Sequence, residues 1–283
     1  LLANLLNIVG NYMLIYGKLG MPELGVAGAA LSTTLSRVIG SIIALYVVIW
    51  SRKTKILINV KEIAKLEGKI LFPILKIGIP SAMEQLIMQT GFILFTKIVS
   101  SLGTLKYAAH NIGLNISSLS FSPSMAFGVA GTALVGKSLG AGDPEKAEQY
   151  SLIIRRIGMI VACFVGLIFI LFSYPIALLY TTDVEVARLS ANVLKILALA
   201  QPGQSTQLIL AGILRGAGDT KYPLIASFLS IWIARVCIGY LFVKVFQLGL
   251  YGAWASILID QYIRTFLLYT RFKKGKWKQA VIN

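Results

Sequence analysis

Apolar stretches of roughly 20 residues recur along the whole sequence, and the charged residues gather in the short segments between them. The chain has 283 residues, of which 57% are hydrophobic and only 13% are charged, whereas a soluble domain carries about a quarter charged residues. A stretch of this length crosses a bilayer as a helix, while the strands of a membrane barrel are shorter and alternate in polarity. We therefore expect an all-α polytopic membrane protein.

The apolar stretches and the segments between them predict eight spans. The spans are Leu1–Tyr16, Val26–Trp50, Leu71–Leu102, Tyr107–Val135, Leu152–Tyr174, Leu189–Leu214, Tyr222–Phe246 and Ala253–Phe272. The predicted organisation is two helices in 1–50, a cytoplasmic linker in 51–70, six helices in 71–272 and a cytoplasmic tail in 273–283. The linker is expected either to lie along the membrane as an amphipathic helix or to be solvated.

Lys and Arg are distributed unevenly when the connections are placed alternately on the two sides of a membrane. One side receives the clusters Arg52–Lys69, Lys137–Arg156, Arg215–Lys221 and Arg271–Lys278. The other side receives only Lys18, Lys106, Arg188 and Lys244. The positive-inside rule then predicts a cytoplasmic C-terminus in a bacterial inner membrane. The net charge of +16 does not indicate a nucleic-acid partner, because the basic residues sit at span ends and not on one face.

A short internal repeat indicates that the chain contains a duplicated unit. The sequence LGVAGAALS at Leu24–Ser32 returns as LGLYGAWAS at Leu248–Ser256, about 220 residues later, and each copy opens a predicted span. The repeat predicts a parallel duplication of six spans, as several transporter folds have. Because the chain begins at Leu1 without an initiator Met, we expect an N-terminally truncated fragment that lacks four upstream spans.

One motif points to a different function and is rejected. Residues Gly131–Ser138 match the pattern G-x-x-x-x-G-K-[ST] of phosphate-binding loops. Such a loop follows a strand and exposes its amides to phosphate, whereas this match ends a long apolar stretch. We therefore do not expect an ATP-driven pump.

Ionisable residues within the predicted spans are the main functional candidates, because a charge at bilayer depth costs about 2.5–3.5 kcal/mol on insertion scales. The candidates are Arg37, Glu84, Lys97, His110, Lys195, Arg235, Asp260 and Arg264. Asp260 and Arg264 are four residues apart on the last span, and Arg235 on the preceding span is a second partner for Asp260. This trio is either functional or a static ion pair that ties two helices together.

Glu84 differs from the other candidates because it has no nearby cation on its own span, where Lys97 is more than three turns away. It follows Pro80, which can kink a helix. An unpaired carboxylate in apolar surroundings favours its protonated form, as a proton-coupled site requires. His110 either accepts a proton or is simply hydrogen-bonded, and Pro123 is expected to interrupt the fourth span.

Amide side chains complete the set of candidates. Asn7 and Asn11 share one face of the first span, where their oxygens either coordinate a cation or form a hydrogen bond between helices. The candidates for lining a substrate site are Gln85, Gln89, His110, Asn115, Arg235 and Arg264.

The sequence resembles the multidrug and toxic compound extrusion (MATE) family, and more closely its bacterial DinF-like branch. The segments that carry the resemblance are Asn7–Gly17, Pro22–Leu31, Gly78–Gln85, Ala108–Ile112, Leu139–Pro144 and Leu214–Thr220. The resemblance implies two six-helix lobes in the full protein, with helices five to twelve in this chain. It also implies a monomeric antiporter, not an enzyme, that exchanges H⁺ or Na⁺ for cationic or amphipathic organic compounds and needs no cofactor.

The resemblance further implies cation or proton coupling at Glu84 and at Asn7, Asn11 and Thr33, with Asp260 as a further candidate. Asn11 stands where some family members have Asp, so this position carries no titratable charge. An alternative function is a flippase of lipid-linked intermediates, which is expected to have a strongly cationic central cavity. A membrane-embedded enzyme is not expected, because the chain has one His and shows no convergent catalytic group.

Overall fold

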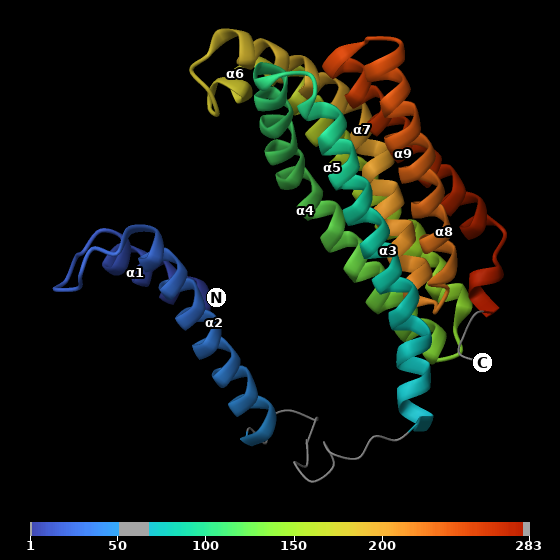
Figure 1. Ribbon diagram of the computed structural model, residues 1–283. Helices are drawn as coiled ribbons and strands as arrows, with labels where there is room; N and C mark the ends of the chain where they lie inside the picture. The colour runs from blue at the N-terminus through green and yellow to red at the C-terminus, as the bar shows by residue number, and fades with distance from the viewer. Residues whose placement is uncertain (1, 51–67, 280–283) are drawn as a thin grey trace. The chain divides into compact units, whose positions relative to one another are not determined.

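The computed structural model describes residues 2–50 and 68–279, which form helices joined by short turns (Figure 1). The elements are α1 (Leu2–Ile15), α2 (Gly25–Trp50), α3 (Gly68–Ser100), α4 (Thr104–Gly140), α5 (Pro144–Leu171), α6 (Ser173–Leu178), α7 (Val184–Gly216), α8 (Lys221–Leu229), the π-helical segments η1 (Ser230–Ile238) and η2 (Leu241–Val245), α9 (Gly249–Lys273) and the 3-10 helix η3 (Lys276–Gln279). The predicted all-α fold is confirmed: seven predicted spans each coincide with one α-helix, and the span Tyr222–Phe246 is divided into α8, η1 and η2. The short helix α6 was not predicted, and most of the predicted linker lies outside the described residues.

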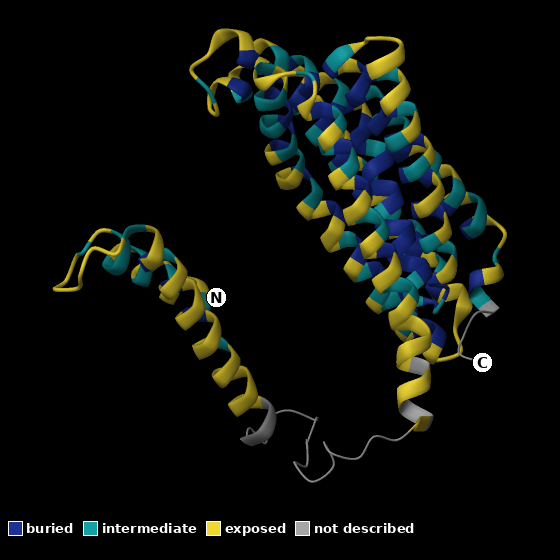
Figure 2. Cartoon of the chain, viewed as in Figure 1, coloured by how far each residue is buried: buried dark blue, intermediate teal, exposed yellow. Residues whose placement is uncertain are grey.

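Four helices of the described chain are long and apolar enough to cross a membrane by themselves, namely Gly25–Val47, Thr104–Gly140, Pro144–Leu171 and Lys221–Val245. One face of α5 exposes a continuous row of large apolar side chains, formed by Ile153, Ile157, Ile160, Phe164 and Leu167. Soluble proteins rarely leave such a row in water, whereas lipid covers it at no cost. The exposed residues in Figure 2 follow the outer faces of the helices in the same way.

The chain divides into two compact units, residues 1–71 and 72–283. In the first unit α1 packs against α2, and in the second α7 packs against α4, α5 and α9 (Figure 1). The buried residues of the second unit concentrate along α7 (Figure 2). This helix therefore forms the centre of the larger unit.

Helices α4 and α7 approach each other through glycines. A Cβ atom added to Gly212 would lie 2.2 Å from the carbonyl oxygen of Gly128, and one added to Gly216 would lie 2.4 Å from that of Thr132. The Thr132 hydroxyl also donates to the carbonyl oxygen of Gly212, at 2.8 Å. Small residues at such an interface bring the backbones close enough for dispersion and hydrogen bonding to hold two helices together in lipid.

The rejected phosphate-loop match lies on this helix interface. Gly131 and Gly136 are both within α4, and a Cβ atom at Gly136 would lie 3.1 Å from the carbonyl oxygen of Gly216. The glycines that satisfy the pattern therefore serve helix packing. The expected interruption at Pro123 is wrong, because α4 continues as one helix through this residue.

The two copies of the repeat form the same local structure at the starts of α2 and α9. Gly25 and Gly249 both have positive φ, +52° and +59°, which a glycine adopts without strain. Three residues later, Gly28 and Gly252 both face the preceding helical segment, with added Cβ atoms 2.2 Å from the oxygen of Leu14 and 3.3 Å from that of Phe242. The two copies of the repeat are therefore similar in backbone structure as well as in sequence.

We predict that Gly212→Ala will destabilise the larger unit, because its methyl group overlaps a backbone oxygen that cannot move away easily. The expected loss is about 1–3 kcal/mol, as for other overpacked sites. Gly140→Ala is the matched control, since an added Cβ atom there meets nothing within 4 Å. Thermal unfolding of the two purified variants tests the prediction, and equal stability would contradict the proposed role of the interface.

Candidate functional site

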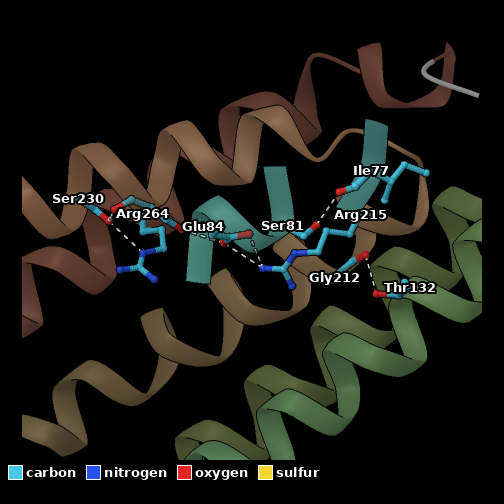
Figure 3. Close-up of polar contacts among 9 residues, drawn as sticks. Ile77, Ser81, Glu84, Thr132, Gly212, Arg215, Ser230 and Arg264 are labelled. Carbon is cyan, nitrogen blue, oxygen red and sulfur yellow. Dashed lines mark hydrogen bonds and ion pairs between the residues drawn. The ribbon is translucent and has the colours of Figure 1, made fainter. Parts of the chain in front are cut away.

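Glu84 is held by a guanidinium group and not isolated. Nη2 of Arg215 lies 3.0 Å from both carboxylate oxygens of Glu84, and the Ser227 hydroxyl donates to Oε1 at 2.9 Å (Figure 3). The expectation of a carboxylate without a fixed cation is therefore wrong. The spacing of charges along α3 could not reveal this pair, because Arg215 belongs to the last turn of α7 and was assigned to a cytoplasmic turn.

Only one of the two partners in this ion pair is buried. The Glu84 side chain is 6% exposed, whereas that of Arg215 is 36% exposed. The pair lines a cavity of about 370 Å³ between α3, α4 and α7, which Gln85 also lines. The remaining lining is mostly apolar and includes Met88, Phe121, Met125, Val129 and Leu208. The site thus combines an accessible charge pair with an apolar wall, as a pocket for amphipathic molecules would.

Glu84 also fixes the position of the first half of α3. Between Ile74 and Thr90, all of which the structure describes, Glu84 is the only buried residue. Gly91 is the next buried residue along α3, and a Cβ atom added to it would lie 2.2 Å from Cγ2 of Ile231. The ion pair with Arg215 and the bond from Ser227 are therefore the main buried attachment of this half-helix.

The trio on the last two predicted spans forms a fully buried cluster. Arg235 Nη2 lies 2.5 Å from Oδ2 of Asp260, and Arg264 Nη2 lies 2.9 Å from Oδ1. The side chain of Asp260 is 0% exposed, and those of Arg235 and Arg264 are 6% and 4% exposed. The structure thus brings together the three predicted residues and places two guanidinium groups on one carboxylate.

Two serines connect this cluster to Glu84. Arg264 Nε donates to the Ser230 hydroxyl at 3.0 Å, and this hydroxyl donates to the backbone oxygen of Ser227 at 3.3 Å. Ser227 in turn donates to Glu84. Because the two serines are three residues apart across the junction of α8 and η1, they lie on one face and join the two charged groups.

A second, smaller cavity of about 90 Å³ adjoins the first, and Met88 and Phe121 line both. His110 lies at this cavity with its ring centroid 5.6 Å from that of Trp254 and 5.9 Å from that of Phe95. Within the described chain neither ring nitrogen of His110 has a hydrogen-bond partner. The alternative that this histidine is simply hydrogen-bonded is therefore not observed.

The sequence reasoning missed several polar residues at this smaller cavity. Gln204 and Gln207 of α7 and Gln261 of α9 all line it and are buried. Nearby, Gln201 donates to the Ser120 hydroxyl at 2.9 Å. The run of polar residues around Pro202, in the middle of a helix, was the signal that could have found the glutamines of α7.

Two predicted lining residues lie elsewhere. Asn115 is exposed, and its Nδ2 donates to the backbone oxygen of Asn111 at 3.0 Å. Gln89 is exposed as well, and neither residue lines the two cavities described above.

In the first unit, Asn7, Asn11 and Thr33 come together between α1 and α2. Nδ2 of Asn7 donates to the Thr33 hydroxyl at 3.2 Å, and Nδ2 of Asn11 donates to Oδ1 of Asn7 at 3.3 Å. The predicted alternative of a hydrogen bond between helices is therefore present. The buried Oδ1 of Asn11 has no partner among the described residues, so it is the oxygen of this group that remains available.

Residues 80–241, more than half of the chain, match the family model described as MatE, and this range contains Glu84, Arg215 and Arg235. The chain belongs to the MATE family. It is 38% identical to the probable multidrug resistance protein NorM of Thermotoga maritima, over 100% of this chain and 60% of that protein. It is 30% identical to the uncharacterized transporter YisQ of Bacillus subtilis, over 98% of this chain and 60% of that protein.

A solved structure described as the outward-facing conformation of a multidrug resistance MATE family transporter superposes on this chain with a TM-score of 0.87. The two are 26% identical, over 98% of this chain and 62% of that structure. The two cavities therefore lie in a polytopic membrane fold of the MATE family. The chain spans about 60% of the length of the curated relatives it matches.

We predict that Asp260→Asn will strongly destabilise the protein, because it leaves two buried guanidinium groups without a counter-charge. Breaking a buried pair in this way costs about 3–5 kcal/mol. The control is Glu148→Gln, which removes an exposed pair with Lys278 and should cost less than about 1 kcal/mol. Expression level and thermal unfolding measure both effects, and a fully stable Asp260→Asn protein would contradict the role of the cluster as a structural tie.

Proposed function

We propose that the protein functions in a secondary active multidrug efflux antiporter that exchanges H⁺ or Na⁺ for cationic or amphipathic organic compounds. The observation that carries this proposal is the partly exposed pair of Glu84 and Arg215 at the wall of an apolar cavity. Membership of the MATE family and the similarity to proteins described as multidrug resistance proteins support it. No cofactor is required besides the coupling ion.

In this proposal the coupling ion acts by competing with Arg215 for Glu84. A proton or Na⁺ on the carboxylate would weaken its attraction to the guanidinium group, and Arg215 can then turn to water because its side chain is already 36% exposed. The first half of α3 would lose its buried attachment at the same moment. Binding of the ion is thereby linked to a movement of a helix that lines the cavity.

The charge of the larger cavity favours an organic exporter over the alternative flippase. The charged residues that line it are Glu84 and Arg215, which neutralise each other. A flippase of lipid-linked intermediates is expected to have a strongly cationic cavity, whereas this cavity has no net charge and the adjoining smaller one carries a single excess positive charge, from Arg235 and Arg264 against Asp260. A neutral, mostly apolar wall suits amphipathic compounds.

The first unit offers a second place for a coupling cation. Oδ1 of Asn11 and the neighbouring oxygens of Asn7 and Thr33 are ligands that suit a hard cation such as Na⁺. None of these three residues can release or accept a proton near neutral pH, so in this proposal a proton acts at Glu84 in the larger unit. The proposal therefore assigns H⁺ to Glu84 and allows Na⁺ to bind at Asn7, Asn11 and Thr33.

We predict that Glu84→Gln will fold normally but lose coupling. Glutamine can still accept a hydrogen bond from Arg215, and the unpaired guanidinium group can reach water, so the expected loss of stability is about 1 kcal/mol. Dye efflux from vesicles under imposed pH and Na⁺ gradients should become independent of the gradient. Gln89→Ala, one turn further along α3 and outside the cavity, is the control. Efflux from Glu84→Gln that follows the gradient as in the wild type would rule out Glu84.

The uneven distribution of Lys and Arg supports a cytoplasmic C-terminus in the bacterial inner membrane. A single cysteine introduced by Lys274→Cys, in a background without Cys163 and Cys237, should resist impermeant thiol reagents in intact cells. The same cysteine should react once the membrane is permeabilised. Rapid labelling in sealed cells would reverse the assigned orientation.

A further inference from the structure

The smaller cavity gathers buried polar atoms that have no partner within the described chain. They are Nε of Arg235, Nε1 of Trp254 and both ring nitrogens of His110, together with Oε1 of Gln261. Arg235 and Trp254 each present an N–H group, and His110 presents at least one in any protonation state. Buried polar groups in proteins are nearly always hydrogen-bonded, so this concentration in one cavity indicates that water or a ligand occupies it.

The cavity also carries excess positive charge. The charged side chains that line it are Arg235 and Arg264, and both are already bound to the single carboxylate of Asp260. The nearest other acid described above, Glu84, is neutralised by Arg215. Two guanidinium groups and one carboxylate leave one positive charge uncompensated, at a depth where an unbalanced charge is costly.

The contacts of Arg235 leave the Nε edge of its guanidinium group without a partner in the part of the chain that the structure describes. Its Nη2 is bound to Asp260, and the Phe92 ring covers the guanidinium group, with Cζ 4.8 Å from the ring centroid. Nε of Arg235 is buried and has no partner among the described residues. Trp254 and His110, whose ring nitrogens also lack partners there, line the same cavity.

We propose that this cavity is a binding site for a small anion, either a halide ion or a carboxylate group, held by Arg235, Trp254 and His110. An anion supplies acceptors for all three donors and balances the extra charge, whereas a neutral molecule would leave the charge in place. The volume of about 90 Å³ is roughly that of three water molecules, so it admits chloride or acetate but not a large organic anion. The site goes beyond the proposed antiport and does not depend on it.

Thermal unfolding of the purified chain in nanodiscs tests this proposal. Sodium chloride, sodium acetate and sodium gluconate are compared at equal Na⁺ concentration, so that only the anion changes. A ligand that binds the folded state raises the unfolding temperature, and the rise should saturate with chloride, acetate or both but not with gluconate. Comparing the rise in unfolding temperature with chloride and with acetate distinguishes a halide site from a carboxylate site.

Matched variants test whether the anion binds at the smaller cavity. Trp254→Phe removes the N–H group and keeps an aromatic ring, and we expect chloride or acetate affinity to fall about tenfold or more. Trp232→Phe is the control, since the Nε1 atom of Trp232 is also buried without a partner but does not line this cavity. His110→Phe provides a second variant if Trp254→Phe does not fold.

Line broadening in chlorine NMR measures chloride binding directly. Wild type and Trp232→Phe should broaden the chloride signal, while Trp254→Phe and His110→Phe should broaden it much less. Equal unfolding temperatures in all three salts, without broadening by the wild type, would overturn the proposal. A salt effect that is the same in all four proteins would overturn it as well.

Discussion

The close contact between α4 and α7 is the constraint on which the larger unit depends. Lipid provides no hydrophobic force between helices, so the two backbones are held by contacts that only glycines such as Gly128 and Gly212 allow. With α7 fixed in this way, its last turn brings Arg215 to Glu84 and its middle places Gln204 and Gln207 at the smaller cavity. The chemistry of both cavities therefore follows from an interface that itself carries no charge.

The two buried carboxylates occupy different electrostatic environments although both are paired with arginine. Asp260 is fully buried with two guanidinium groups, whereas the partner of Glu84 is partly exposed. A pair that is fully buried resists separation because each charge would be left without solvent. The pair at Glu84 can separate because Arg215 has water as an alternative partner. Exposure of the cation, more than the identity of the acid, is therefore what separates the structural tie that we predict at Asp260 from the coupling role that we propose for Glu84.

The sequence was sufficient for the helices, the repeat and the trio around Asp260, since these depend on apolar length, local spacing and charges on neighbouring spans. It was not sufficient for the environment of Glu84, because Arg215 approaches from a helix 131 residues away and looked like an ordinary charge at the end of a span. It also missed Trp254 and Gln261, which resemble packing residues until the fold places them beside His110. Proximity between distant helices is the information that spacing along one helix cannot supply.

The first half of α3 contains one buried residue, which has a consequence for how its position is controlled. From Ile74 to Thr90 the helix makes roughly five turns, and Glu84 is its only buried residue. The other residues of this stretch are exposed or half-buried, so Glu84 is the buried point at which the larger unit holds it. In the proposed function, an ion that binds Glu84 would therefore act on one contact and affect a long stretch of helix, without opening a packed core.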